Sequence, residues 1–278
     1  MAKRTHVFDP RQNMNRPDFE IFHYHDAKMQ EVELHHHDFY EVYFFLGGKV
    51  EYLVEGRSYT LLSDDILLIS PMELHRPNVA PDEAYERIVL WISRDCLSSI
   101  APEADLARRC FQPGRNLFHC AHTQIPVLIR RLAQKAADGE IGSELCARGL
   151  LLELMGELLA LTASGGAHSA APGPEGTPLV QEILRYIGAH YSEPLTLDLL
   201  AGHFFVSKSY LSHLFRRSVG TSLYRYVVLK RLQHARQLLS DGSGPGEVCR
   251  SCGFRDYANF YRAFREVYGV SPNEAVSL

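Results

Sequence analysis

Three consecutive histidines followed by a glutamate form the most chemically suggestive cluster in the sequence. His35, His37 and Glu41 have the spacing His-x-His-x-x-x-Glu, and His75 lies beyond the strands expected next. Alternate residues of a strand point to one face, so two imidazoles there can meet a carboxylate and a third imidazole from a neighbouring strand. Such a set either coordinates a divalent metal ion or hydrogen-bonds a polar molecule. The same four residues therefore serve two hypotheses, a metal site and a small-molecule pocket.

Other residues that could complete such a pocket are aromatic or cationic. Ligand pockets combine aromatic walls with a few placed polar groups. The candidates for this lining are Tyr40, Tyr43, Tyr52, Arg76 and Trp91. The sequence contains no recognisable nucleophile triad and no Gly-Lys-Ser/Thr loop that would cradle phosphates. No residue is therefore assigned a catalytic role.

The cysteines do not form an evident metal site or disulfide framework. They are Cys96, Cys110, Cys120, Cys146, Cys249 and Cys252. Only Cys249 and Cys252 form a close pair, and a structural zinc site needs about four ligands. No second pair at ligand spacing accompanies them, so we expect reduced thiols.

Length and composition are those of a packed globular protein. The chain has 278 residues, of which 46% are hydrophobic and 22% charged. This composition excludes general disorder, collagen-like repeats and a bare disulfide scaffold. The longest apolar stretch, residues 149–162, is interrupted by Glu153 and Glu157, and the N-terminal 15 residues lack the apolar core of a secretory signal. We therefore expect a cytoplasmic protein with no membrane partner.

Charge divides the chain into two parts. Residues 178–278 carry 12 Lys+Arg against 8 Asp+Glu and are net +4, whereas residues 1–177 carry the remaining 17 and 25 and are net -8. The sign changes at residues 163–178, a stretch rich in Gly, Ala, Ser and Pro without apolar periodicity. This stretch is expected to be a flexible linker, and the basic part is the one suited to a polyanion.

The acidic part contains two kinds of sequence pattern, one typical of strands and one typical of helices. Short segments at 42–46, 50–54, 58–62 and 66–69 are rich in Tyr, Val and Phe and are separated by turns, which indicates an antiparallel sandwich or barrel. From residue 125 to 161 leucines recur every three or four positions, and Gly139 and Gly142 divide this stretch into two helices. The apolar faces of these helices are expected to pack on the barrel, on each other or on a second subunit.

The basic part is helical and repeats itself with an offset of 49 residues. The matched pairs are Ser207 and Asp256, Leu211 and Phe260, Phe215 and Phe264, Arg216 and Arg265, Gly220 and Gly269, and Ser222 and Ser271. The first residue of each copy can cap a helix N-terminus, and the glycine can end that helix. A shorter helix precedes each copy, at 197–203 and 247–252, and a long amphipathic helix at 223–239 joins them. This pattern predicts two helix-turn-helix units.

The longer helix of each copy has an apolar and a polar face. Leu211, Leu214 and Phe215 in the first and Tyr257, Phe260 and Phe264 in the second are expected to be core residues. The outward-facing candidates for DNA binding are Lys208, Ser209, Ser212, His213, Arg216 and Arg217, and Arg255, Asn259, Arg262 and Arg265. A single polar face is commonly just solvated, but its duplication favours recognition of the major groove of double-stranded DNA. Two such helices read successive grooves when they lie about 34 Å apart.

Specific motifs in the basic part match a known family. The second copy reads Cys252-Gly253-Phe254-x-Asp256-x-x-Asn259-Phe260-x-Arg262-x-Phe264-Arg265, then Gly269-x-Ser271-Pro272, and the connecting helix reads Arg231-Leu232-x-x-Ala235-x-x-Leu238-Leu239. With these motifs, residues 178–278 resemble the DNA-binding domain of AraC/XylS-type transcription regulators. The resemblance implies that Ser209, His213, Arg216, Asn259 and Arg262 lie nearest to bases. The sequence departs from the family at Cys249, where alanine is usual, and at residues 273–275, where Tyr-Arg is common.

The histidine cluster resembles the two cupin motifs. It reads His35-x-His37-x-x-x-Glu41, with Gly48 after it and Pro71-x-x-x-His75 beyond. The equivalents of these four residues hold one divalent ion in metal-binding cupins. The sensor domains of AraC/XylS-type regulators share the barrel and usually bind small molecules without metal. Met29 replaces the glycine expected before the first motif, and the second motif has lost its glycines.

Together these observations predict a mixed fold of two domains. Residues 1–162 form a cupin-like β-barrel with a helical element for effector sensing and dimerisation, 163–177 a flexible linker, and 178–278 an all-α double helix-turn-helix domain. We expect a sequence-specific transcription activator or repressor, a homodimer without enzymatic activity, whose effector is, by resemblance, a sugar or sugar derivative. The alternatives are a metal-dependent cupin enzyme, of dioxygenase or isomerase type, fused to a DNA-binding module, and a regulator without an effector.

Overall fold

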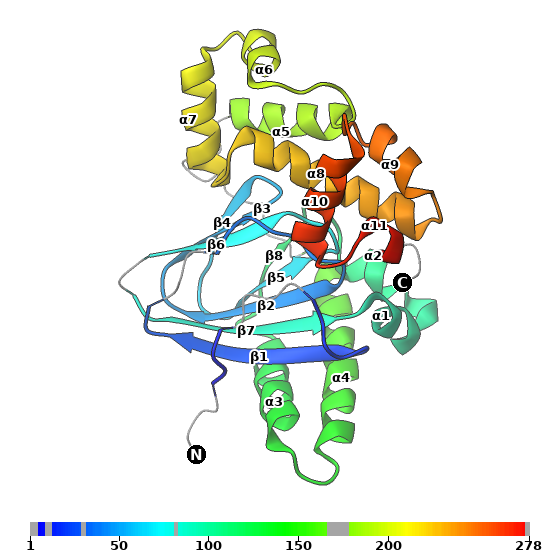
Figure 1. Cartoon of the computed structure of the whole chain (residues 1–278). Helices are drawn as coiled ribbons and strands as arrows, with labels where there is room; N and C mark the ends of the chain where they lie inside the picture. Colours follow the sequence, from blue (N-terminus) through cyan, green and yellow to red (C-terminus); the bar gives the residue numbers. More distant parts are fainter. Residues whose placement is uncertain (1–4, 9–12, 29–31, 81–82, 166–177, 276–278) are drawn as a thin grey trace. The chain divides into compact units, whose positions relative to one another are not determined.

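The chain folds as two compact units. The structure is a computed structural model that describes residues 5–8, 13–28, 32–80, 83–165 and 178–275. One unit comprises Met1–Val32 and His36–Gly173, and the other comprises Pro174–Leu278 with the short segment Glu33–His35. Figure 1 shows sheets with helices in the first unit and helices in the described part of the second. The expected mixed fold is therefore confirmed.

The described strands of the first unit form two antiparallel sheets, with the orders β1-β7-β2-β5-β8 and β4-β3-β6. The strands are β1 (Phe19–Asp26), β2 (Tyr40–Gly47), β3 (Val50–Val54), β4 (Arg57–Thr60), β5 (Asp65–Ile69), β6 (His75–Val79), β7 (Tyr85–Ile92) and β8 (Leu117–His119). The strands expected between residues 42 and 69 are confirmed as β2 to β5. The other four strands have no counterpart in the sequence analysis.

The chain passes from the larger sheet to the smaller one between β2 and β3. The pairing of β2 with β7 shifts register between Phe45 and Gly47. Gly48 then has φ +113°, and a Cβ at this position would lie 2.6 Å from the Ala84 carbonyl oxygen, so glycine is required at this crossing. In the described residues the two sheets pair separately, so the cupin-like β-domain has the form of a two-sheet sandwich whose barrel is not closed.

Each face of the five-stranded sheet has its own core. Along β2, Tyr40, Val42 and Phe44 pack in a cluster with the helices, whereas Tyr43 and Phe45 belong to the cluster between the sheets. Because both faces are covered, these strands are almost continuously apolar. The space between the sheets, lined by the second cluster, is called the sheet interior below.

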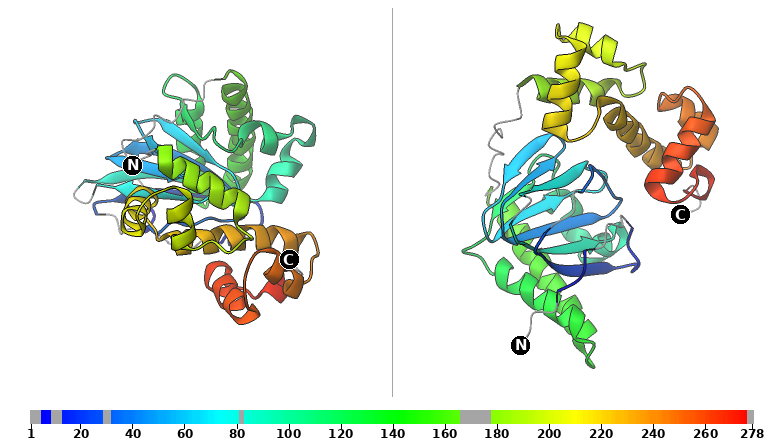
Figure 2. Two further views of the ribbon diagram at one scale, coloured as in Figure 1. Left: turned by 90° about the horizontal axis from the view of Figure 1, so that it is seen from above. Right: turned by 60° about the vertical axis from the view of Figure 1, so that its left-hand side comes forward.

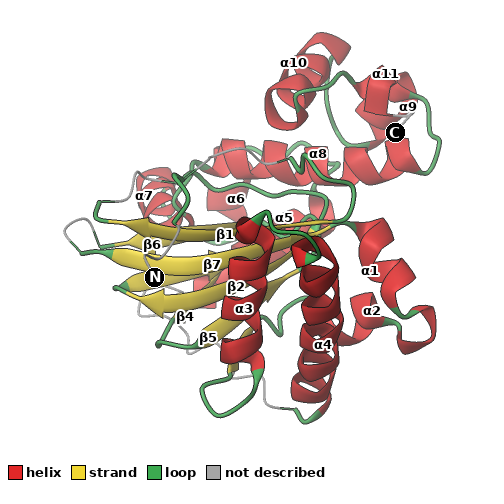
Figure 3. Ribbon diagram, turned by 90° about the horizontal axis from the view of Figure 1, so that it is seen from below, coloured by secondary structure: helices red, strands yellow, loops and turns green. Residues whose placement is uncertain are grey.

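Two long helices cover the outer face of the five-stranded sheet. They are α3 (Ile125–Asp138) and α4 (Ser143–Ala163), which lie side by side against the strands in Figure 3. Gly139 ends α3 and Gly142 precedes α4, both with positive φ, as predicted. The shorter helices α1 (Arg94–Ile100), η1 (Pro102–Ala104) and α2 (Leu106–Cys110) precede β8. The expected linker starts at Ala163, the last residue of α4, and its residues 166–177 lie outside the described residues.

The second unit is organised along one central helix. Its helices are α5 (Pro178–His190), α6 (Leu197–His203), α7 (Lys208–Val219), α8 (Leu223–Ser240), α9 (Pro245–Ser251), α10 (Tyr257–Tyr268) and α11 (Pro272–Ala275). Figure 2 shows α6 and α7 near one end of α8 and α9 and α10 near the other. Leu232 and Leu239 of α8 are buried in one cluster with Phe260 and Phe264 of α10. In the described part of the chain, no helix meets the length and hydropathy needed to cross a bilayer.

Candidate functional site

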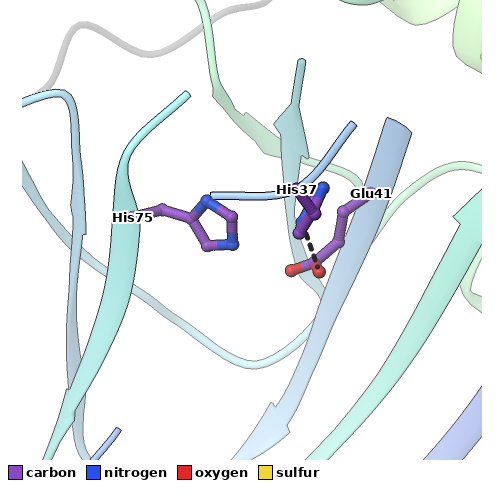
Figure 4. Close-up of side chains that lie close together, drawn as sticks. All are labelled: His37, Glu41 and His75. Atoms are coloured by element: carbon purple, nitrogen blue, oxygen red, sulfur yellow. Dashed lines mark hydrogen bonds and ion pairs between the residues drawn. The ribbon is translucent and has the colours of Figure 1, made fainter. Parts of the chain in front are cut away.

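Three of the four predicted histidine and glutamate residues converge in the sheet interior. The ligand atoms of His37, Glu41 and His75 lie within 4.8 Å of one another, and the three residues are 3%, 5% and 0% exposed. Figure 4 shows the His37 imidazole next to the Glu41 carboxylate, with the His75 imidazole to one side of them, and His37 Nε2 lies 3.2 Å from Glu41 Oε2. The arrangement is a buried polar cluster in an otherwise aromatic environment.

The two sheets supply this cluster jointly. His37 lies in the loop before β2, Glu41 is the second residue of β2, and His75 is the first residue of β6 in the other sheet. His75 pairs with Val54 of β3, whose side chain is also part of the sheet interior. The cluster therefore depends on the packing of one sheet on the other.

Backbone contacts determine the tautomer of both rings. His37 Nδ1 lies 2.9 Å from the Phe39 carbonyl oxygen, and His75 Nδ1 lies 2.7 Å from the Glu73 carbonyl oxygen. A carbonyl oxygen only accepts, so each Nδ1 donates and the Nε2 of a neutral ring carries no proton. This tautomer is also the one that metal-ligating histidines adopt.

Aromatic donors hold the Glu41 carboxylate in place. Trp91 Nε1 donates to Oε2 at 2.9 Å, and the Tyr52 hydroxyl donates to Oε1 at 3.4 Å. Burial raises the pKa of Tyr52 well above its ordinary value, and the negative charge of Glu41 raises it further. The phenol therefore stays protonated and remains a donor. A carboxylate fixed in this way can accept hydrogen bonds from a ligand or bind a cation.

His35 is not part of the cluster, contrary to the sequence analysis. The expectation assumed that His35 and His37 alternate on one strand, but β2 begins only at Tyr40. Both histidines precede the strand, so the rule of alternation does not apply to them. His35 Nδ1 instead contacts the Glu33 carbonyl oxygen at 2.8 Å. The group brought together in the described residues is His37, Glu41 and His75.

Three of the five expected lining residues face the sheet interior and two do not. Tyr43, Tyr52 and Trp91 are buried in the inter-sheet cluster. Tyr40 packs on the opposite face of β2, where its ring centroid is 4.6 Å from that of Phe111. Arg76 follows His75 in β6 and therefore points to the other face of that strand. Assigning Tyr40 and Arg76 to the lining was wrong because neighbouring strand residues alternate.

The sequence analysis also missed Arg87, a fully buried arginine in the sheet interior. It is 1% exposed and forms an ion pair with Asp26 of β1. The signal that could have identified it is a charged residue within the apolar run of β7, on the same face of the strand as Trp91.

The two predicted helix-turn-helix units are present in the second unit. The first consists of α6 and α7 and the second of α9 and α10, and α7 and α10 have 12 residues each. Ser207 accepts a hydrogen bond from Tyr210 N at 3.1 Å, and Asp256 accepts one from Asn259 N at 2.8 Å. Gly220 and Gly269 end the helices in the left-handed conformation, as predicted.

The outward faces of α7 and α10 are as expected, with one exception. All ten candidate DNA-binding residues, from Lys208 to Arg265, are exposed. Phe215, Phe260 and Phe264 are fully buried, whereas Tyr257 is 40% exposed and was wrongly expected in the core. Tyr257 is the first residue of α10, where the helix has only begun to enter the core. On α7, Tyr210 is 51% exposed on the polar side and has no counterpart among the predicted residues.

Hydrogen bonds order the polar face of α10. The Asp256 carboxylate accepts from the Asn259 amide group, whose oxygen in turn accepts from the Arg262 guanidinium. These residues are spaced by three positions and therefore line one side of the helix. The N-cap thus positions two side chains suited to reading base edges, since Asn pairs with adenine and Arg with guanine.

The cysteine pair of the second unit is structural. Cys249 and Cys252 are 4% and 0% exposed, and all six cysteines are free thiols. Burial raises the pKa of Cys252 to about 11. The expectation of reduced thiols agrees with this structure, and burial makes the pair unreactive.

A β-sandwich with a buried polar cluster, joined to a double helix-turn-helix unit, is the architecture of a transcription regulator with a ligand-binding domain. Comparison with known families agrees with this class. The model of the AraC-like ligand binding domain matches residues 17–155, and that of a helix-turn-helix domain matches residues 200–276. The chain belongs to the AraC family of transcription regulators.

Individual relatives are also regulators. The chain is 28% identical to the transcriptional activator RhaS of Escherichia fergusonii over 249 residues, which cover 86% of each protein. It is 27% identical over 198 residues to the transcriptional regulator GbdR of Pseudomonas aeruginosa, covering 69% of this chain and 52% of GbdR, so the match spans about half the length of that protein. Among solved structures, ToxT from Vibrio cholerae O395 is 15% identical, and the match covers 94% of this chain and 98% of ToxT with a TM-score of 0.39.

Proposed function

We propose that this protein is a cytoplasmic transcription regulator that binds specific sequences in double-stranded DNA and is controlled by a small molecule bound in the sheet interior. The observation that carries the proposal is the duplicated helix-turn-helix with two exposed polar helix faces. A net charge of +4 on residues 178–278 supports contact with a polyanion.

The residues of α7 and α10 divide into two roles. Ser209, His213, Arg216, Asn259 and Arg262 read base edges, because Arg, Asn, Ser and His side chains match the donor and acceptor patterns of the major groove. The remaining candidates contact phosphates and set the register of the protein on the duplex, and they are Lys208, Ser212, Arg217, Arg255 and Arg265.

Fluorescence anisotropy across a salt series tests this function. The full chain is titrated with its own upstream intergenic DNA and with unrelated DNA. We expect specific binding to exceed nonspecific binding by ~10³ or more, and Arg216→Ala and Arg262→Ala each to weaken specific binding by about tenfold or more. Arg185→Ala is the matched control, because Arg185 is an exposed arginine on α5, outside both helix-turn-helix units. Equal affinity and equal salt slopes for both DNAs would contradict the proposal.

The effector is proposed to contact His37, Glu41 and His75 in the sheet interior. A polar molecule with hydroxyl groups, such as a sugar derivative, could donate to Glu41 and hydrogen-bond the imidazoles. To regulate DNA binding, the effector must bind one arrangement of the protein more tightly than another. Its addition should therefore change the occupancy or spacing preference of the protein on promoter DNA, and unchanged occupancy would argue against control by the effector.

Dimerisation is proposed to occur through α4. Leu145 and Leu152 are 75% and 52% exposed. With Gly149 and Gly156 they form a seam spaced by four, three and four residues, the heptad spacing of helices that pack in pairs. A Cβ added at either glycine would meet no atom within 4 Å, so the seam is open to a second copy of the chain.

Sedimentation at micromolar concentration tests this interface. We expect a dimer that Leu152→Glu converts to a monomer, because the substitution places a charge in the seam. Cys146→Glu adds the same charge at an exposed position of α4 outside the seam and should leave the dimer intact. A wild-type monomer, or dissociation by both variants, would contradict a seam in α4.

A metal-dependent cupin enzyme is the second candidate, favoured by the spacing of the buried donors. His37, Glu41 and His75 fit a three-ligand site, and a bound divalent ion would supply Lewis-acid polarisation of an oxygen ligand. Elemental analysis of the purified protein separates the candidates. Stoichiometric iron, manganese or zinc that is lost in His37→Ala would support the enzyme, whereas protein without metal would support the regulator.

A further inference from the structure

A second set of buried polar atoms lies in the sheet interior and is not used by the proposed function. Arg87, Tyr43 and Tyr85 are 1%, 2% and 0% exposed. Within the described residues, Arg87 Nη2 and the hydroxyls of Tyr43 and Tyr85 have no hydrogen-bond partner. Buried polar atoms are almost always bonded to protein, water or ligand, so three such atoms in one interior need an explanation.

Strand register places these three residues on one face of the five-stranded sheet. Arg87 pairs with Phe45 and Val89 pairs with Tyr43, so Tyr43 and Arg87 are diagonal neighbours on one face of the β2–β7 pair. Long side chains bridge such a diagonal separation. The guanidinium carbon of Arg87 also lies 4.5 Å from the centroid of the Tyr85 ring. Arg87 and Tyr85 are therefore adjacent donors, and Tyr43 is a donor on the same face of the sheet within diagonal reach of Arg87.

The surroundings of Arg87 stabilise its charge without using all its donors. Nη1 forms an ion pair with Asp26, whose side chain is 19% exposed. The guanidinium carbon lies 4.7 Å and 5.4 Å from the ring centroids of Tyr24 and Phe8. Aromatic faces attract a cation but do not replace a strong hydrogen-bond acceptor. Burial raises the pKa of Tyr85, so its hydroxyl also remains a donor.

We infer that Arg87, Tyr43 and Tyr85 bind a carboxylate group of the effector. The inference rests on the proposed function, because it names the chemical class of ligand for the same sensor unit. A carboxylate only accepts hydrogen bonds, has about four lone-pair positions, and matches the planar edge of a guanidinium. Bonds from these donors to a charged acceptor are stronger than bonds to a neutral one.

The spacing of residues on β7 gives the distance from Arg87 to the Glu41 cluster. Arg87 and Trp91 are four residues apart on β7, which corresponds to about 13 Å at ~3.3 Å per residue. Val89 lies between them on the same face, and the Glu41 cluster lies beyond it. An acid with its carboxylate at Arg87 would then extend past Val89 towards Glu41.

Calorimetry with matched pairs of an acid and a neutral compound tests the inference on the full chain. The pairs are hexanoate with hexanamide, phenylacetate with phenylacetamide, and glucuronate with glucose, which vary the tail while changing the charge. We expect the acid to bind about tenfold or more tightly than its neutral partner in at least one pair. Absence of binding by all three acids, or equal affinity within every pair, would overturn the inference.

Hydroxyl deletions locate the acid. Tyr43→Phe and Tyr85→Phe each remove an oxygen without a protein partner, so each should weaken binding of that acid about tenfold without lowering the unfolding temperature of the unliganded protein. The matched control is Tyr59→Phe, because the Tyr59 hydroxyl donates to Asn116 Oδ1 at 3.1 Å. This control should lower the unfolding temperature and leave acid binding unchanged. Unchanged acid binding in both test variants would overturn the assignment.

Specific DNA binding of the same preparation, measured without acid, separates this inference from the proposed function. If no acid binds more tightly than its neutral partner while specific DNA binding is intact, only the carboxylate site is contradicted. Absence of specific DNA binding contradicts the proposed function itself.

Discussion

The two units of this protein place their polar side chains in opposite environments. On α7 and α10, Arg216 and Arg262 are exposed on helices anchored by buried phenylalanines. In the sheet interior, Glu41 and Arg87 are 5% and 1% exposed among aromatic rings. Exposed side chains can change with little effect on folding, whereas buried charged groups depend on their partners. DNA binding should therefore be separable from stability, whereas the buried Glu41 cluster should be coupled to it.

The largest loss of stability is expected when a core residue beneath the exposed face of α10 is replaced. Phe260→Ala should lower the free energy of unfolding of the second unit by about 3–5 kcal/mol, because the ring is fully buried against Phe254 and Phe264. Chemical denaturation followed by circular dichroism measures this loss. Tyr257→Ala on the same helix is the control, since Tyr257 is 40% exposed, and a comparable loss there would contradict this assignment of the core.

Removal of the buried carboxylate should have the next largest effect. Glu41→Ala leaves the Trp91 N–H and the Tyr52 hydroxyl without their acceptor, which should destabilise the first unit by about 1–3 kcal/mol. Glu41→Gln keeps an acceptor oxygen and should therefore destabilise the first unit less than Glu41→Ala does. Denaturation midpoints of the two variants give the comparison. A Glu41→Ala protein as stable as the wild type would show that the buried cluster is not coupled to folding.

Helix capping should contribute less to the free energy of unfolding than these buried groups, and by a similar amount in both repeats. Ser207→Ala and Asp256→Ala should each cost about 1 kcal/mol, because each removes the acceptor for one backbone N–H at a helix N-terminus. Asp256→Ala should also weaken specific DNA binding, since Asp256 positions Asn259. Asp256→Ser retains the cap without the full contact to Asn259. If this variant restored DNA affinity completely, the positioning role of the aspartate would be excluded.

The smallest effect on stability is expected at the residues proposed to read DNA. Arg216→Ala and Arg262→Ala should change the free energy of unfolding by no more than about 0.5 kcal/mol, because both side chains are exposed. The same variants should lose specific DNA affinity in the anisotropy assay. Unfolding midpoints measured on those preparations complete the comparison. A large loss of stability would remove the distinction between the two units.

Agreement between sequence and structure is best where interactions are local. The caps at Ser207 and Asp256 and the terminating glycines lie at the predicted positions, because each acts within one turn of its helix. Agreement is poorest in the β-domain, where β1 and β6 to β8 were not anticipated. Their residues gain strand structure through pairing with distant segments, as when Phe19 of β1 pairs with Ile92 of β7.

The amino-acid sequence by itself determined the double helix-turn-helix, its exposed polar faces and the family to which the chain belongs. Those features follow from helical periodicity and caps, which involve residues only a few positions apart. The sequence also predicted that His37, Glu41 and His75 meet, whereas only the tertiary structure decided that His35 stays outside this cluster and that Arg87 lies in the same interior. These outcomes depend on where strands begin, on their register and on sheet packing, because a shift of one residue moves a side chain to the opposite face.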